Sequence, residues 1–163
     1  MINQLYSKKM AKDYGFSLIE ILVVIAIVGV IASIGIPSFL RARTDAKLRG
    51  AASNLKGDLE LAKMRAIREN AYVVILFEES GYLIWVDNGS LSGNWEMEDD
   101  EILVRNRDLP EGVYLEMDTP FPGNLTRFVG RGVSEDDGDL VLRNNRGKEK
   151  TVNINRLGKI SMQ

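Results

Sequence analysis

The pattern of apolar and polar positions changes near the N-terminus, where an apolar run begins at Phe16, and again at about residue 70. From Phe16 to Ile36 the side chains are apolar or small, and Glu20 carries the only charge. A helix of this length, at about 1.5 Å per residue, spans about 30 Å, the thickness of the hydrocarbon core of a bilayer. The run is longer than the apolar part of an ordinary secretory signal, which has about 7–15 residues. It therefore predicts a transmembrane helix over residues 16–36.

Helical periodicity continues beyond this run as an amphipathic pattern over residues 37–70. Charged residues, including Asp58, fill the positions between the apolar ones, and Asn70 is a plausible helix terminator. We expect one helix from about Phe16 to Asn70, with its second part covering a sheet. The apolar residues recur at spacings of three and four and form one stripe: Leu48, Ala51, Ala52, Leu55, Leu59, Ala62 and Ala66.

Three residues weaken this helix around the end of the apolar run. Gly29 and Gly35 have low helix propensity, and Pro37 lacks a backbone N–H. They are either ordinary residues of a membrane helix or places where the helix stretches during filament packing.

From residue 71 onward the period changes to two and β-forming residues dominate. Residues 72–77 and 82–86 flank a turn and predict a hairpin. Residues 90–100 form an acidic loop that contains Trp95, and the prolines on either side of Phe121 indicate a second loop. The fold class is therefore α+β, a long N-terminal helix followed by an all-antiparallel sheet or sandwich over residues 71–163. Further strands are expected at about 101–106, 113–117, 125–129, 139–144, 149–154 and 159–162.

The composition excludes several kinds of chemistry. The chain contains no cysteine, so it has neither disulfides nor thiolate metal sites, and it contains no histidine, the commonest general base. No nucleophile elbow, phosphate loop or dinucleotide fingerprint is present. We expect no catalytic residues, no cofactor and no small-molecule substrate.

Charge is unevenly distributed, although the net charge is only −2. Residues 71–124 carry a net −10, whereas residues 16–70 and 125–163 each carry +3. Such zoning favours contacts between unlike surfaces. Basic residues flank the apolar run on both sides, so the charge rule for membrane topology does not decide its orientation.

The segment Gly15–Glu20, which reads GFSLIE, resembles the processing site of type IV prepilins and type II secretion pseudopilins. The match includes a short basic leader, glycine before the cut, phenylalanine after it and glutamate at the fifth mature position. The resemblance implies that a membrane prepilin peptidase removes residues 1–15 and that Phe16 becomes N-methylated. It also implies a single-pass protein of the inner membrane with a cytoplasmic N-terminus and a periplasmic domain over residues 71–163. A signal-peptidase site near Ala32-Ser33 is the alternative.

Glu20 has a physical role in this interpretation. A carboxylate among lipid tails costs at least about 2.5–3.5 kcal/mol on insertion scales. Cleavage creates an amine on Phe16 at about the same depth, and Glu20 of one subunit could neutralise the amine of a neighbour. Pairing within one chain, or a tolerated interfacial carboxylate, are the simpler alternatives.

The C-terminal part resembles the globular domain of the GspH/FimT pseudopilins. The resemblance implies a minor pseudopilin or pilin whose partners are other pilins, the prepilin peptidase and membrane lipid. It does not separate a type II secretion system from a type IV pilus or a competence system. A single-pass protein that never assembles is a further alternative. The matching segments are Arg127–Gly132, Gly138–Leu142, Thr151–Ile154 and Leu157–Ile160.

DNA capture or surface-ligand binding by a minor pilin is the competing function. Some FimT-type pilins carry a C-terminal Gly-Arg-x-Arg motif, which Gly158-Lys159-Ile160-Ser161 resembles only in part. Lysine loses the bidentate fork of arginine, and serine carries no charge. We therefore expect at most weak DNA contact, through Arg156 and Lys159. The basic residues of this part are expected on adjacent predicted strands: Arg143, Arg146, Lys148, Lys150, Arg156 and Lys159.

Two acidic runs, at residues 96–101 and 135–139, are rich in oxygen ligands. Neither has the spacing of an EF-hand. We expect solvated loops there and no metal site.

Overall fold

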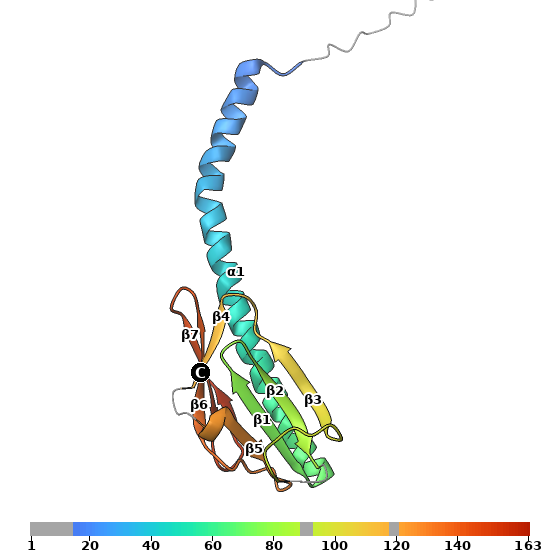
Figure 1. Ribbon diagram of the computed structural model, residues 1–163. Coiled ribbons are helices and arrows are strands. Elements are labelled where there is room, and N and C mark those ends of the chain that lie inside the picture. The colour runs from blue at the N-terminus through green and yellow to red at the C-terminus, as the bar shows by residue number, and fades with distance from the viewer. Residues whose placement is uncertain (1–14, 89–92, 118–120) are drawn as a thin grey trace, which may run out of the picture. The chain divides into compact units, whose positions relative to one another are not determined.

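The computed structural model describes residues 15–88, 93–117 and 121–163, and its compact units divide between Leu40 and Arg41. The predicted leader, apart from Gly15, and the first residues of the predicted acidic loop therefore lie outside the described residues. Within the described residues, the chain forms one long helix followed by strands, which confirms the predicted α+β class (Figure 1).

Helix α1 (Leu18–Glu69) has 52 residues, and its ends differ from the predicted ones by one or two positions. The predicted apolar stripe is buried throughout, with at most 3% of any member exposed. Asp58 lies on the same face and is only 6% exposed. The expectation that Asp58 lies apart from the apolar stripe was wrong. Residues three and four positions apart share a helix face, and Asp58 is three positions after Leu55 and four before Ala62.

The helix ends just before Asn70, the predicted terminator. Asn70 has a positive φ of 48°, a conformation that asparagine adopts more readily than most residues. The amide of Ala71 then donates to the carbonyl of Ala66 at 3.2 Å. This bond satisfies one of the carbonyls left open at a helix C-terminus, as in a Schellman motif.

The strands form two four-stranded antiparallel sheets, and the predicted strands are confirmed with small shifts at their ends. The predicted hairpin is β1 and β2, which pair in register from Tyr72 opposite Asp87 to Glu78 opposite Gly81. The first sheet has the order β3-β2-β1-β5: β3 (Ile102–Asp108), β2 (Gly81–Asp87), β1 (Tyr72–Glu78) and β5 (Leu125–Phe128). The second has the order β4-β6-β7-β8: β4 (Val113–Met117), β6 (Gly138–Asn144), β7 (Glu149–Ile154) and β8 (Ile160–Met162).

One hydrophobic core joins the second part of α1 to both sheets. Figure 1 shows β1, β2 and β3 running along this part of the helix. Phe121 lies in a loop, as expected, just before the short 3-10 helix η1 (Pro122–Asn124), but its side chain is buried. Its ring stacks on that of Phe77 with the centroids 5.4 Å apart. The loop therefore contributes to the core as well as connecting strands.

Glycines of the C-terminal segments allow close backbone packing against the end of the helix. A Cβ atom on Gly130 would lie 2.5 Å from Oδ1 and 3.0 Å from Cα of Asn70. Gly158 has a φ of +72°, and a Cβ there would lie 2.0 Å from the carbonyl oxygen of Gly132. Lys63 of α1 donates a 2.7 Å hydrogen bond to the carbonyl of Gly158. These contacts hold two loops against the C-terminal end of α1.

Candidate functional site

The residues of the predicted processing site lie at the start of α1. Gly15, Phe16 and Ser17 precede the helix, and the Phe16 side chain is 79% exposed. The Ser17 carbonyl accepts hydrogen bonds from the amides of Glu20 and Ile21 at 3.0 and 3.2 Å. Glu20 thus lies in the first helical turn with its side chain exposed, where a carboxylate is favourable for the helix dipole.

The apolar part of α1 has no buried face within its own unit. Its large apolar side chains are about half exposed or more, from Phe16 to Leu40. The helix contains an 18-residue window with a mean hydropathy of 2.8, none of it buried, so length and composition suit a membrane span. A surface of this kind needs another apolar environment, which lipid or the helices of other subunits can supply.

Gly29, Gly35 and Pro37 all lie inside this helix, which continues through them. Among the described residues, no atom of another segment would lie within 4 Å of a Cβ added at either glycine. Pro37 cannot donate to the carbonyl four residues earlier, at Ser33, so one helical hydrogen bond is missing. The weak points predicted from the sequence therefore lie in one exposed stretch, and local stretching of the helix there stays a prediction.

An ionic cluster around the buried carboxylate of Asp58, not predicted from the sequence, joins α1 to the first sheet. Asp58 accepts hydrogen bonds at Oδ2 from the Tyr82 hydroxyl at 2.7 Å and from Nε of Arg107 at 2.8 Å. Nε of Arg105 lies 3.3 Å from Oδ1. Burial, and then the hydrogen bond to Asp58, raise the pKa of Tyr82 well above its ordinary value. The same carboxylate raises the pKa of Arg107 through its hydrogen bond. The signal that could have revealed the cluster is the position of Asp58 on the apolar stripe.

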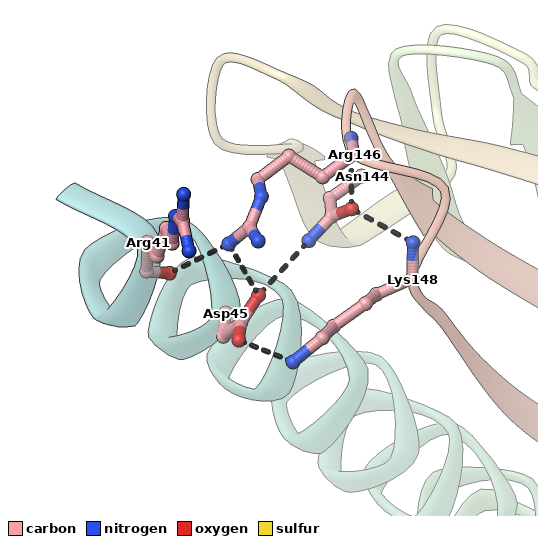
Figure 2. Close-up of polar contacts among 5 residues, drawn as sticks. All are labelled: Arg41, Asp45, Asn144, Arg146 and Lys148. Carbon is pink, nitrogen blue, oxygen red and sulfur yellow. Dashed lines mark hydrogen bonds and ion pairs between the residues drawn. The ribbon is translucent and has the colours of Figure 1, made fainter. Parts of the chain in front are cut away.

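A second ionic cluster joins the turn between β6 and β7 to α1 (Figure 2). Asp45 accepts a hydrogen bond from Nζ of Lys148, and Nη1 of Arg146 lies 3.6 Å from Asp45 Oδ1. Arg146 also donates to the backbone carbonyl of Arg41 at 3.4 Å. The Asn144 side chain accepts from the amides of Arg146 and Lys148, each at 3.0 Å, which fixes the turn. The Lys148 hydrogen bond lowers the pKa of Asp45, so this carboxylate is ionised at neutral pH.

The expectation that the six basic residues lie on adjacent strands was wrong for four of them, and the six are divided among separate contacts. Only Arg143 and Lys150 lie within strands, and the other four lie in turns or loops. Arg143 pairs with Glu116 and Glu149, and Arg156 pairs with Asp137 at 2.9 Å. Lys159 has no side-chain partner among the described residues. The two residues proposed for weak DNA contact, Arg156 and Lys159, share one loop, but Arg156 is already paired with Asp137.

Arg127 contacts residues of both acidic segments. The Arg127 guanidinium lies between the rings of Tyr72 and Trp95, 4.3 and 4.0 Å from their centroids, and pairs with Glu135. The carbonyl of Gly93 accepts from Nη1 of Arg127 at 3.3 Å. No group of three metal-ligating side chains occurs among the described residues. These contacts give the described part of the acidic loop, from Gly93 onward, a defined place on the first sheet.

Comparisons with known proteins identify the family. The model of the family "Type II transport protein GspH" matches residues 51–158, and the prokaryotic N-terminal methylation motif matches residues 10–36. The type IV major pilin protein PilA of Myxococcus xanthus is 42% identical over 45 residues, which are 28% of this chain and 20% of that protein. The match therefore spans about a fifth of that pilin's length.

Solved structures of three minor pilins and pseudopilins share the fold. The type IV minor pilin FimU of Pseudomonas aeruginosa is 17% identical, with a TM-score of 0.58 over 73% of this chain and 90% of that one. The minor pseudopilin EpsH of the Vibrio cholerae type 2 secretion system is 12% identical, with a TM-score of 0.57 over 72% of this chain and 96% of EpsH. GspH of E. coli is 18% identical, with a TM-score of 0.56 over 72% of this chain and 88% of the E. coli protein. Because the family model covers about two thirds of the chain and the fold agrees, this protein belongs to the GspH family of type II transport proteins and has a pilin-like fold.

Proposed function

We propose that the chain is a minor pseudopilin or minor pilin, made as a membrane prepilin and assembled into the pseudopilus of a type II secretion system or into a type IV pilus. The peptidase cleaves after Gly15, and Phe16 becomes the methylated N-terminus. The N-terminus faces the cytoplasm and the β-rich domain faces the periplasm. The role needs no catalysis, because the subunit acts by packing its helix against other subunits.

The exposed apolar part of α1 carries this proposal. The core of the protein uses helix residues from Leu48 onward, so the earlier apolar residues do not contribute to it. The N-terminal methylation motif matches residues 10–36, which include most of these residues. The combination suits a helix that first lies in lipid and later packs among the helices of a filament.

Glu20 is the assembly residue in this proposal. It is the only charge in an otherwise apolar stretch of α1, and its side chain is exposed. In a bundle of such helices, the amine on a neighbour's Phe16 would neutralise it in a medium of low dielectric constant, where the attraction is strong. The pairing lowers the cost of keeping both charges away from water.

Site-specific photo-crosslinking tests the proposed function. A photo-reactive residue replaces Leu22, which is 51% exposed on the apolar part of α1. Irradiated cells should yield crosslinks to other proteins with the prepilin motif, identified by mass spectrometry. The matched control is the same variant in cells without the prepilin peptidase, where these crosslinks should be lost. Crosslinks to unrelated membrane proteins alone, or the same products in both strains, would favour a single-pass protein that never assembles.

A further inference from the structure

Six basic side chains surround α1 immediately after its apolar part. Four come from the helix and two from the turn between β6 and β7, about 100 residues later in the chain. At about 100° per residue, Arg41 and Arg49 share one side of the helix, and Arg43 and Lys47 lie on the opposite side. We call this group the basic collar: Arg41, Arg43, Lys47, Arg49, Arg146 and Lys148.

The tertiary structure completes the basic collar through Asp45. Its carboxylate contacts Arg146 and Lys148 together, whose side chains remain 37% and 58% exposed (Figure 2). A single carboxylate cannot neutralise two cations. Asp45 compensates one of the six positive charges, and Glu111, whose backbone carbonyl accepts from Lys47, compensates at most one more. The collar therefore keeps an excess of at least four positive charges on a surface open to solvent.

Chain connectivity keeps the basic collar close to the membrane. Arg41 follows Ile36, the last residue of the apolar run, by five positions. Even a fully extended connection of this length reaches only about 17 Å, and a helical one about 7.5 Å. The negative potential of a membrane with anionic lipids extends about 8–10 Å at physiological ionic strength. Whatever the tilt of the domain, part of the collar lies within or near this range.

We propose that the basic collar binds the phosphate groups of anionic phospholipids and so holds the β-rich domain against the membrane surface before assembly. The proposal rests on the membrane-anchored state of the proposed function. Because the span tethers the domain, the effective lipid concentration is high and even weak contacts are occupied. The turn residues add a second point of contact on one side of the helix, which favours one orientation of the domain.

A polar pocket beside the basic collar offers a place for a lipid headgroup. It has a volume of about 310 Å³. Lys47 donates one hydrogen bond to the backbone carbonyl of Glu111 at 3.2 Å, which leaves two ammonium hydrogens for a phosphate. The pocket is lined by Thr44, Lys47, Glu111, Gly112, Tyr114 and Asn145.

The position of these cations also favours a lipid partner. Lysine and arginine directly after a span that begins in the cytoplasm oppose the usual charge bias for that orientation. Their presence is explained if they act at the outer surface of the membrane after insertion. The acidic surface of a neighbouring subunit is the alternative partner, and the experiment below distinguishes it.

A single labelled cysteine in the full chain tests the proposal. The chain has no native cysteine, and Ala46 is exposed among the helical members of the basic collar. Ala46→Cys, carrying a fluorophore, is placed in nanodiscs of phosphatidylcholine with or without about 30% phosphatidylglycerol. Quenching of the label by neutral acrylamide should fall about twofold in the anionic discs, and about 0.5 M NaCl should abolish the difference.

Two double variants give the test its specificity. Arg43→Gln with Arg49→Gln should remove at least half of the lipid effect. Arg131→Gln with Lys159→Gln removes equal charge near the far end of α1 and should leave the effect unchanged. Equal quenching in both lipids, a difference that survives high salt, or an equal loss in the control would overturn the proposal. A collar variant that leaves quenching unchanged but reduces incorporation into filaments would assign the collar to a neighbouring subunit. The span inserts into both kinds of disc, so a negative lipid result leaves the proposed function intact.

Discussion

The hydroxyl of Tyr82 lies 2.7 Å from Oδ2 of Asp58, and this hydrogen bond joins β2 to the buried face of α1. Both residues are buried, with 2% and 6% of their surfaces exposed. Arg105 and Arg107 of β3 both pair with this carboxylate, which leaves the cluster with one net positive charge. The helix is therefore held to the first sheet by an ionic cluster as well as by apolar packing.

Tyr82→Phe should lower the free energy of unfolding by about 1.5–3 kcal/mol at neutral pH, because a buried charged acceptor loses a donor. The wild-type tyrosine also has a raised pKa in the folded state. Its contribution is therefore complete below the unfolded pKa of about 10 and falls as the pH rises toward the folded value. Urea unfolding followed by circular dichroism from pH 7 to 11 should show this loss.

Tyr114→Phe is the matched control, since Tyr114 is 44% exposed. It should change the free energy of unfolding by less than about 0.5 kcal/mol. The difference between wild type and Tyr82→Phe should shrink above pH 10. A difference that stays constant to pH 11 would argue against the hydrogen bond as its source.

Gly130→Ala should destabilise the domain by about 1–3 kcal/mol, because the new methyl group meets the backbone and side chain of Asn70. Gly50→Ala makes the same chemical change inside α1, where no atom of another described segment would lie within 4 Å of the new Cβ. It should stabilise the protein by up to about 1 kcal/mol through helix propensity. Thermal unfolding of the two variants should therefore shift in opposite directions, and a parallel shift would contradict the packing of Gly130 against Asn70.

Processing after Gly15 should leave a mature chain that begins at Phe16. Intact-mass analysis of the membrane fraction should give this chain plus one methyl group on Phe16. A mature terminus near Ser33 would instead indicate a signal peptidase, and retention of Met1 in cells with the peptidase would contradict the processing motif.

Glu20→Val should leave membrane insertion intact or improve it, because it removes the only charge from the apolar segment. It should also reduce incorporation into filaments, measured in sheared filament fractions. Glu20→Asp retains the charge and should incorporate better than the valine variant. Equal incorporation of wild type and Glu20→Val would show that Glu20 is not an assembly contact.

DNA binding should be weak and sensitive to salt. Arg156 already pairs with Asp137. Of the other basic residues in the C-terminal part, Arg143 pairs with Glu116 and Lys148 pairs with Asp45. The full chain in detergent should lose its DNA binding between about 50 and 200 mM salt in a fluorescence anisotropy titration. Micromolar binding at the higher salt, removed by Arg156→Ala with Lys159→Ala, would instead support a DNA-binding pilin.

Local patterns in the sequence predict much of this protein. The period of α1, its buried stripe from Leu48 to Ala66, the terminator Asn70 and the hairpin of β1 and β2 all follow from residues close together in the chain. Such features depend on backbone propensity and on the burial of one face, both of which a short window of sequence records. The processing motif before α1 is equally local.

The ionic clusters depend on the tertiary structure alone. Asp58 meets Arg107 across 49 positions of the chain, and Asp45 meets Lys148 across 103. Which cation reaches which carboxylate is set by the order and register of the strands, and a register shift of one residue would turn each side chain to the opposite face. For the same reason, the sequence shows the basic residues Arg146 and Lys148, whereas only the folded turn places them beside the helix in the basic collar.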